Sequence, residues 1–130
     1  MTLQVELVSP EGILFEGEAD MVIARTVGGG DIAFLTGHVS FVGTLAAGLV
    51  KILQPGNQSQ LIATHRGFVS VSHDRVSILS DVAELSATID VARAEAAKAR
   101  AEEELRAHSD DDEARASLRR AEVRLQAARG

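Results

Sequence analysis

Ser80–Leu105, SDVAELSATIDVARAEAAKARAEEEL, is the stretch in which the character of this 130-residue chain changes. Up to Glu84 the sequence alternates between apolar and polar residues and is broken by turn residues, which is typical of β-structure. From Asp90 it continues as a charged, alanine-rich segment with no Pro, and with no Gly before the last residue. This change of period predicts a β-domain over residues 1–86 and a helical region over residues 87–130.

The first part is a series of short strands joined by turns. Leu3, Val5 and Leu7 alternate with polar residues, which is the period of a half-buried strand. Pro55–Gly56 suits a type II turn, and His73–Asp74 suits a tight hairpin turn. About ten such strands at even spacing, with no helical segment between them, favour an antiparallel sandwich or barrel over a βαβ fold.

The second part predicts two helices joined by a short polar loop. Ser86, Thr88 and Asp90 offer N-caps for the first helix, which runs from about Asp90 to Ala107. Ser109 and Asp110 resemble the start of a capping box for the second. The second helix has small and apolar residues at alternating spacings of four and three, which form the seam Ala114, Leu118, Ala121, Leu125 and Ala128. Two helices with such seams form an antiparallel hairpin.

Alanine seams allow close approach but bury little apolar area. At about 25 cal/mol per Å², the hairpin gains only a few kcal/mol from docking, and high helix propensity keeps its helices partly formed after release. These properties fit a mobile arm. The alternative is a hairpin that stays packed in one place.

Composition excludes several classes of function. The chain has no cysteine, so disulfides and Cys-based metal or thiol chemistry are excluded. No segment marks a signal peptide or reaches the about 20 apolar residues that span a bilayer, and we expect a soluble cytoplasmic protein. The four histidines lack metal-ligand spacing, and no Ser/His/Asp constellation emerges. We therefore expect no metal site, no catalytic centre, no enzymatic activity and no nucleic-acid partner.

The C-terminal end is basic although the chain is acidic. Residues 114–130 hold five arginines and one acidic residue, whereas the whole chain has a net charge of −6. Such an end indicates an acidic partner surface or an anionic ligand. The alternative is a solvated helix face that the neighbouring helix neutralises.

Asp90 and Arg93 lie one helical turn apart at the head of the first helix. The Arg93 guanidinium can hold a phosphate, and Asp90 can accept hydrogen bonds from an amine or a ribose hydroxyl. In a folded hairpin Arg100, Arg120 and Arg124 can converge on the same anion. The alternative is an ordinary i,i+3 ion pair with surface arginines around it.

Five motifs stand in a fixed order along the chain. They are DIAFLTGHVSF at Asp31–Phe41, GLVKI at Gly48–Ile52, RGFVSV at Arg66–Val71, ILSDVAE at Ile78–Glu84 and IDVARA at Ile89–Ala94. In these motifs, and in its two-part layout, the chain resembles the epsilon subunits of bacterial F-type ATP synthases.

The resemblance implies an α+β fold, in which a flattened antiparallel β-sandwich of about ten strands precedes an antiparallel helical hairpin. It implies a non-catalytic rotor subunit of the central stalk, bound to the gamma subunit and the c-ring, that couples proton flow to ATP synthesis. Such a subunit lies at the cytoplasmic face of the plasma membrane and touches the membrane only through the complex. The hairpin of bacterial members can extend to the catalytic beta and alpha subunits and inhibit ATP hydrolysis.

The resemblance also implies roles for particular residues. The expected contacts with the rotor ring are Asp31 and His38. The expected contacts with the beta subunit are Arg115, Arg119, Arg120 and Arg124. No cofactor is required, but regulatory ATP is expected at Glu84, Ile89, Asp90, Arg93, Arg100, Arg120 and Arg124. The alternative function is a stand-alone ATP-sensing domain that uses the same cluster without a rotor.

Overall fold

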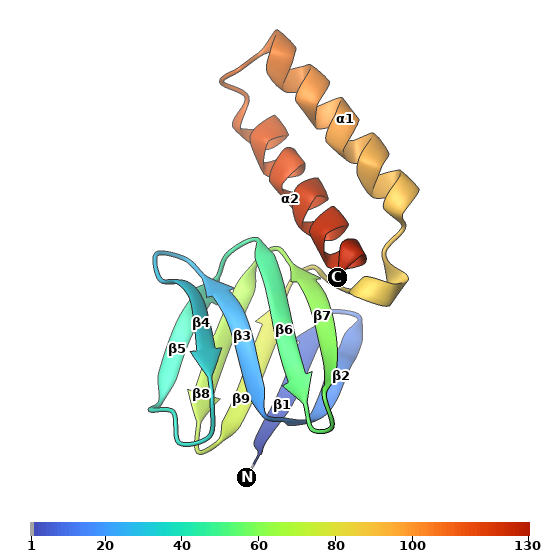
Figure 1. Cartoon of the computed structure of the whole chain (residues 1–130). Coiled ribbons are helices and arrows are strands. Elements are labelled where there is room, and N and C mark those ends of the chain that lie inside the picture. Colours follow the sequence, from blue (N-terminus) through green and yellow to red (C-terminus); the bar gives the residue numbers. More distant parts are fainter. Residues whose placement is uncertain (1) are drawn as a thin grey trace.

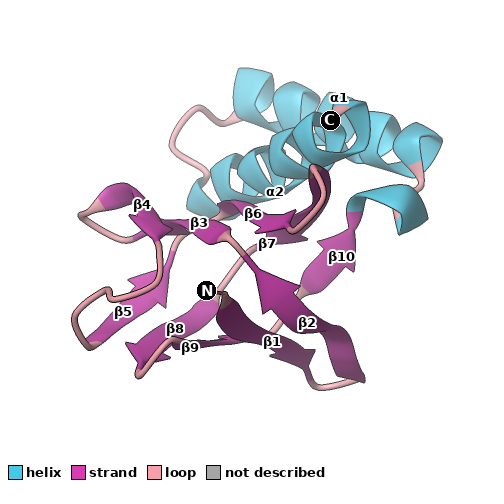
Figure 2. Cartoon of the chain, turned by 60° about the horizontal axis from the view of Figure 1, so that its bottom comes forward, coloured by secondary structure: helices cyan, strands magenta, loops and turns pink. Residues whose placement is uncertain are grey.

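The computed structural model describes residues 2–130, in which a β-domain carries a helical hairpin (Figure 1). The described residues form ten strands: β1 (Leu3–Ser9), β2 (Gly12–Ala19), β3 (Met21–Thr26), β4 (Gly30–Phe34), β5 (Phe41–Leu45), β6 (Gly48–Gln54), β7 (Gln58–Thr64), β8 (Gly67–Ser72), β9 (Arg75–Ser80) and β10 (Ala83–Leu85). They form one sheet in the order β10-β7-β6-β3-β5-β8-β9-β1-β2, with β4 beside β3. The sheet folds back on itself, so that β1, β8 and β9 lie opposite β3, β6 and β7 (Figure 2). The predicted sandwich of about ten strands is confirmed.

One strand pairing differs from the antiparallel prediction. Among residues 2–130, β1 and β9 form the one parallel pair, with Val5 opposite Val76 and Leu7 opposite Ile78. Alternation of apolar residues has the same period in both kinds of ladder. The direction in which two strands distant in sequence pair is therefore set by the tertiary fold.

The core between the two layers consists of large aliphatic side chains and one phenylalanine. Its largest fully buried members are Phe34, Leu3, Leu7, Leu45, Ile52, Ile62 and Ile78, followed by valines of β3, β6, β8 and β9. In β1, Leu3, Val5 and Leu7 are buried and Gln4 is exposed, as the alternation predicts. Removing this much apolar area from water is the main stabilising contribution to the sandwich.

Two backbone positions depend on special conformations. His73 and Asp74 have φ values of 51° and 60°, the positive pair that a type I′ hairpin turn needs, so the predicted tight turn is confirmed. Gly67 starts β8 with a φ of 153°, and a Cβ at this position would collide with the carbonyl oxygen of Leu79 on β9. Glycine allows the two strands to approach closely here.

A 3₁₀ turn, η1 (Ser86–Thr88), connects β10 to two helices, α1 (Val91–Ala107) and α2 (Asp112–Arg129). The helices pack against each other as the predicted hairpin, and α2 carries the main contacts with β6, β7 and η1. The hairpin rises from the end of the sandwich at which β6 begins and β7 ends (Figure 1). Among residues 2–130, neither helix is long and apolar enough to cross a membrane.

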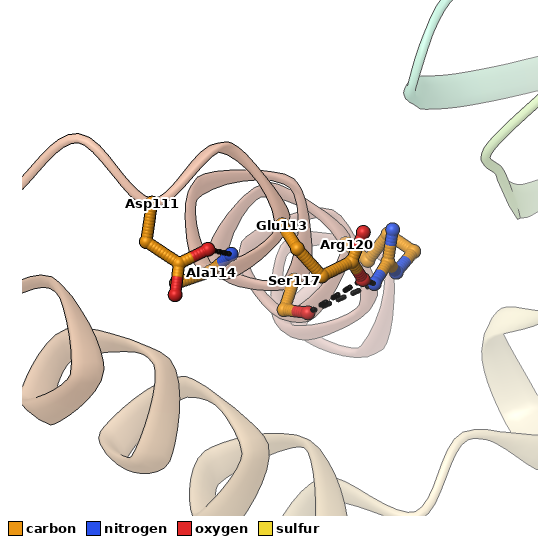
Figure 3. A network of polar contacts seen from close by, with 5 residues as sticks. All are labelled: Asp111, Glu113, Ala114, Ser117 and Arg120. Atoms are coloured by element: carbon orange, nitrogen blue, oxygen red, sulfur yellow. Dashed lines mark hydrogen bonds and ion pairs between the residues drawn. The ribbon is translucent and has the colours of Figure 1, made fainter. Parts of the chain in front are cut away.

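Both helices have an aspartate as their N-cap. The Asp90 carboxylate accepts a hydrogen bond from the Arg93 backbone N–H at 3.1 Å, and the Asp111 carboxylate accepts one from the Ala114 backbone N–H at 3.0 Å (Figure 3). Asp90 is thus one of the three N-caps that the sequence offers for α1, beside Ser86 and Thr88. The capping-box residues predicted for α2 are wrong, because Asp111, and not Ser109 or Asp110, is the N-cap whose side chain accepts from the helix.

Candidate functional site

The hairpin meets the sandwich along a seam whose apolar part is small. Its buried members are Ala63 on β7, Ile89 before α1, and Val123 and Ala127 on α2, with Ala47, Leu49 and Ala128 partly buried beside them. Val123 and Ala127 thus form a second apolar face of α2. Of the predicted interhelical seam, Ala114, Ala121 and Leu125 are buried, whereas its last member, Ala128, packs beside this second face. The sequence analysis missed this face, because Val123 and Ala127 fall outside the spacing of four and three. Helix α2 is therefore held from two sides.

An ion pair across the seam links α2 to the last strand. Arg124 Nη2 donates to Glu84 Oε2 at 3.2 Å, and Arg124 Nε lies 2.8 Å from Glu84 Oε1. Among residues 2–130 this Nε has no hydrogen-bond acceptor in line with its N–H, so the shorter contact is electrostatic. The two side chains are only 19% and 26% exposed, which makes this pair better shielded from water than the other ion pairs found in the same residues. Shielding strengthens an ion pair relative to one on the open surface.

Arg120, one turn earlier on α2, is held along its own helix. Its Nη2 donates to Glu113 Oε1 at 2.9 Å and to Ser117 Oγ at 2.9 Å (Figure 3). Arg119 reaches the sandwich instead, where its Nη2 donates to the Ala47 carbonyl oxygen at 3.3 Å. The α2 arginines are thus divided between contacts within the hairpin and contacts with the β-domain.

A cleft of about 560 Å³ lies beside this seam, between the sandwich and the first half of α2. It is lined by His65, Arg66, Asp81, Val82, Glu113 and Arg120, among others. Burial lowers the pKa of His65 below its ordinary value of 6.5; Glu84 opposes this effect, and Arg120 and Arg124 add to it. His65 was not predicted as a site residue, since nothing in its sequence neighbourhood marks it as part of an interface.

The residues predicted to bind nucleotide occupy two places. Glu84, Arg120 and Arg124 lie along the seam, and Ile89 is buried in its apolar part. Asp90, Arg93 and Arg100 belong to the α1 side of the hairpin and are exposed. Among residues 2–130, no hydrogen bond or ion pair joins the α1 group to the seam group. In the docked hairpin, Asp90 serves as a helix cap and Glu84 as the partner of Arg124.

The two residues predicted to contact a rotor ring are also separated. Asp31 is near the start of β4, where its carboxylate lies 4.0 Å from the guanidinium of Arg25. His38 lies in the bend after β4, where its ring packs edge-on against Phe34 and Phe41 at centroid distances of 5.0 and 6.4 Å. They stand at opposite ends of one strand and do not form a single cluster.

Of the arginines predicted to contact a beta subunit, Arg115 is also engaged within the hairpin. It pairs with Asp112 at 3.2 Å and donates to the Ser109 carbonyl oxygen at 2.7 Å. Together with the contacts of Arg119, Arg120 and Arg124, this means that all four arginines have intramolecular partners while the hairpin is docked.

The outer face of the sandwich carries a further feature that the sequence analysis did not identify, an apolar row across five strands. Register places Thr44, Phe68, Leu79, Val8 and Ile13 side by side from β5 to β2. Phe68, Leu79 and Ile13 are 58%, 54% and 58% exposed. Four members of the row, Val8, Thr44, Phe68 and Leu79, line a groove of about 740 Å³, and the charged residues Arg66 and Asp81 are also part of its lining. Contiguous exposed apolar surface of this kind marks an interaction site.

The part of the chain that the structure describes contains no group of three or more His, Cys, Asp or Glu side chains arranged to hold a metal ion.

These features define a class of protein, a β-sandwich with an exposed apolar row and a helical hairpin docked through a small seam. Residues 2–86 match the family model "ATP synthase, Delta/Epsilon chain, beta-sandwich domain", and residues 88–129 match "ATP synthase, Delta/Epsilon chain, long alpha-helix domain". The chain belongs to the ATP synthase delta/epsilon chain family, and the resemblance inferred from its motifs is confirmed.

Relatives agree with this assignment, and two solved structures share the fold. The ATP synthase epsilon chain of Thermobifida fusca is 48% identical over 130 residues, which cover 98% of this chain and 92% of that one. The epsilon chain of Halalkalibacterium halodurans is 42% identical, with 98% and 97% covered. A chain of the Euglena gracilis mitochondrial ATP synthase has a similar fold, with a TM-score of 0.73, 21% identity, and 98% and 78% of the two chains covered. A chain of the Tetrahymena thermophila mitochondrial ATP synthase central stalk and c-ring gives a TM-score of 0.57 at 16% identity, with 68% and 70% covered.

Proposed function

We propose that this chain is a non-catalytic central-stalk subunit of a bacterial F-type ATP synthase, and that it couples proton flow through the c-ring to ATP synthesis. Membership of the family supports a place in the synthase. The Tetrahymena chain of similar fold comes from a central stalk and c-ring, which supports the same place here. In this role the protein sits at the cytoplasmic face of the plasma membrane and touches the membrane only through the complex.

The observation that carries the proposal is the exposed apolar row on the β-domain. A rotor subunit has to transmit torque through a permanent partner, and a contiguous apolar patch with a polar rim provides such a contact. We assign the row as the surface that binds the gamma subunit. Phe68 and Leu79, which lie opposite each other on β8 and β9, form its centre.

Copurification tests this assignment. The double change Phe68→Ser and Leu79→Ser should abolish copurification of the gamma subunit, because exposed apolar anchors carry most of the affinity of such an interface. Ser70→Asn with Ser77→Asn is the matched control, since these residues form the neighbouring polar pair on the same two strands. Equal recovery of gamma with both double variants would remove the row from the interface. Failure of the unchanged chain to associate with gamma at all would reject the rotor role.

For the hairpin we propose a regulatory arm that leaves the sandwich and extends toward the catalytic beta and alpha subunits, where it inhibits ATP hydrolysis. The seam between the hairpin and the sandwich is small and rich in alanine, which supports this proposal. Its burial stabilises the docked state by only a few kcal/mol. Release would free Arg119 and Arg124 from their partners on the β-domain and make them available, with Arg115 and Arg120, to an acidic surface. Truncation after Ala87 should raise ATPase activity while assembly survives. Unchanged hydrolysis would reject an inhibitory arm.

We also propose that regulatory ATP stabilises the folded hairpin, through Glu84, Ile89, Asp90, Arg93, Arg100, Arg120 and Arg124. The exposed Arg93 is the best placed of these to meet a phosphate, whereas Glu84 and Arg124 first have to exchange their mutual contact for the ligand. ATP titration of the full chain should therefore show at least about tenfold weaker binding for Arg93→Ala, which corresponds to the loss of one charge-assisted hydrogen bond. Arg129→Ala, on an exposed residue at the end of α2, is the control. Equal affinity of Arg93→Ala and the unchanged chain would exclude this site.

Asp31 and His38 are the proposed contacts with the c-ring. Because they lie at opposite ends of β4, each should be tested alone. We expect His38→Ala to lower proton-driven ATP synthesis by the assembled synthase without loss of gamma. Normal coupling would remove His38 from the ring contact, and the same assay with Asp31→Ala decides the role of Asp31.

A further inference from the structure

We propose that His65 makes docking of the hairpin sensitive to pH, so that acidification releases α2 from the sandwich. The physiological consequence rests on the regulatory arm proposed above, whereas the docking itself can be measured in the chain alone.

His65 belongs to the β-domain but lies at the seam with the hairpin. It connects β7 to β8, and its backbone N–H donates to the Val82 carbonyl oxygen at 3.2 Å, which fixes it to the segment before β10. Its side chain is half-buried and lines the cleft that faces α2. Release of the hairpin therefore changes the surroundings of this ring directly.

The charged groups around the ring are already paired with one another. Glu84 of β10 pairs with Arg124, Glu113 of α2 pairs with Arg120 at 2.9 Å, and Asp81 pairs with Arg66 at 3.5 Å. The cleft also holds Arg119, which donates to the Ala47 carbonyl oxygen. A positive charge on His65 would thus meet carboxylates that already have partners and would lie near two guanidinium groups of α2.

The ring nitrogens give a second reason. His65 Nδ1 is fully buried and has no hydrogen-bond partner among residues 2–130. A neutral imidazole can keep its one proton on Nε2 and leave a lone pair at Nδ1. Protonation puts an N–H on Nδ1 at a position without an acceptor, and a buried donor without a partner is costly. The docked state therefore accommodates the neutral ring and disfavours the charged one.

The direction of the pH effect follows from these contacts. Burial, together with Arg120 and Arg124, lowers the pKa of His65 in the docked state, although Glu84 opposes the shift. Release removes the two arginines with α2 and exposes the ring to water, so its pKa returns toward 6.5. The docked state is thus most stable above pH 6.5 and weakens as the pH falls below that value. For each unit by which docking lowers the pKa, the docking equilibrium weakens by up to about tenfold.

The chain is well suited to a distance measurement because it contains no cysteine. Gln58→Cys on β7 and Glu103→Cys on α1 place two labels at exposed positions, one on the sandwich and one on the hairpin. Energy transfer between the labels should fall as the full-length chain is taken from about pH 8 to about pH 5.5, the range in which histidine titrates. His65→Gln, which cannot be protonated, should abolish this response. His108→Gln, at the exposed C-cap of α1, should keep it.

A pH response of the His65→Gln chain equal to that of the unchanged chain would overturn the proposal, and so would the absence of any response in the unchanged chain. NMR titration of the unchanged chain provides a test that needs no variant: we expect the pKa of His65 to lie below its ordinary value of 6.5, and a value that is not lowered would reject the inference. ATPase assays of the truncated protein report on the regulatory role separately. Docking that responds to pH without any inhibition of hydrolysis would refute that role and leave this inference standing.

Discussion

The sandwich core and the seam between the sandwich and the hairpin are both packed with aliphatic side chains, but these side chains differ in size. The sandwich core is built from Leu, Ile, Val and Phe side chains that are fully buried between two layers of strands. The seam has two alanines among its four buried residues and relies on one half-buried ion pair in addition. One chain thus contains a strongly packed unit and a weakly packed one, and modest changes in conditions act on the second alone.

The largest expected effect is in the sandwich. Leu7→Ala should lower the free energy of unfolding by about 3 kcal/mol, because it leaves a cavity in a core that cannot collapse around it. Urea unfolding followed by circular dichroism measures this. Leu79→Ala, at a residue that is 54% exposed, is the control and should cost well under half as much. Equal losses would show that the two layers are not the rigid part of the molecule.

Val123→Ala should act on the seam and not on the sandwich. Loss of two buried methyl groups should weaken docking by about 1.5 kcal/mol, while the sandwich keeps its unfolding free energy. Hydrogen exchange of the α2 amides measures this as faster opening. Glu122→Ala, on the neighbouring exposed residue, should leave exchange nearly unchanged. Faster exchange in the sandwich as well as in α2 would mean that the comparison is wrong and that the chain is one cooperative unit.

Glu84→Gln tests the ionic part of the seam. It keeps the shape of the side chain but removes the charge opposite Arg124, which should weaken docking by about 1 kcal/mol for a partly exposed pair. The same exchange measurement reports the change. Glu113→Gln serves as the comparison, since its pair with Arg120 lies within the hairpin and its carboxylate side chain is 79% exposed. A larger effect at Glu113 than at Glu84 would contradict the assignment of the seam.

The smallest effect is expected at the helix caps. Asp90→Ala should cost α1 somewhat less than about 1 kcal/mol, because it removes the acceptor for the Arg93 backbone N–H. In the Asp90→Ala variant, the helical signal in circular dichroism should therefore be lost at a lower temperature than the signal of the sandwich. Asp110→Ala, on an exposed loop residue that is not the N-cap of α2, should have little effect. The reverse order would show that α2 begins earlier than Asp112.

Whether a prediction agrees with the structure depends on how far apart in the sequence the interacting residues are. The tight turn at His73 and Asp74 and the cap at Asp90 depend on neighbours within a few residues, and both agree with the structure. The cap of α2 was misplaced because Asp110, Asp111 and Asp112 are chemically alike, and only the folded backbone brings the Asp111 carboxylate to the Ala114 N–H. The second apolar face of α2 was missed because Val123 and Ala127 pack on β-strands whose position relative to the helix no helical pattern contains.

The candidate site shows the same limit. The resemblance implied roles for Glu84, Arg120 and Arg124 one by one. Their division into a cross-seam pair and an intrahelical pair depends on which face of α2 meets β10. His65 and the apolar row from Thr44 to Ile13 have no distinguishing neighbours in the sequence. Both form sites only in the folded chain, where segments distant in sequence lie side by side, as β1 and β9 do.

Alternation, turn chemistry, alanine content and motif order determined from the sequence alone that this protein has a β-sandwich, a helical hairpin and a place in the epsilon family. The sandwich and the hairpin follow from local patterns, which periodicity reports, whereas the place in the family follows from the resemblance that the motifs carry. The tertiary structure decided the parallel pairing of β1 and β9, the pairing of Arg124 with Glu84, and the placing of a partly buried His65 at the cleft that α2 also lines. These depend on the relative placement of distant elements, because electrostatic and packing energies are set by distances in space and not by positions in the chain.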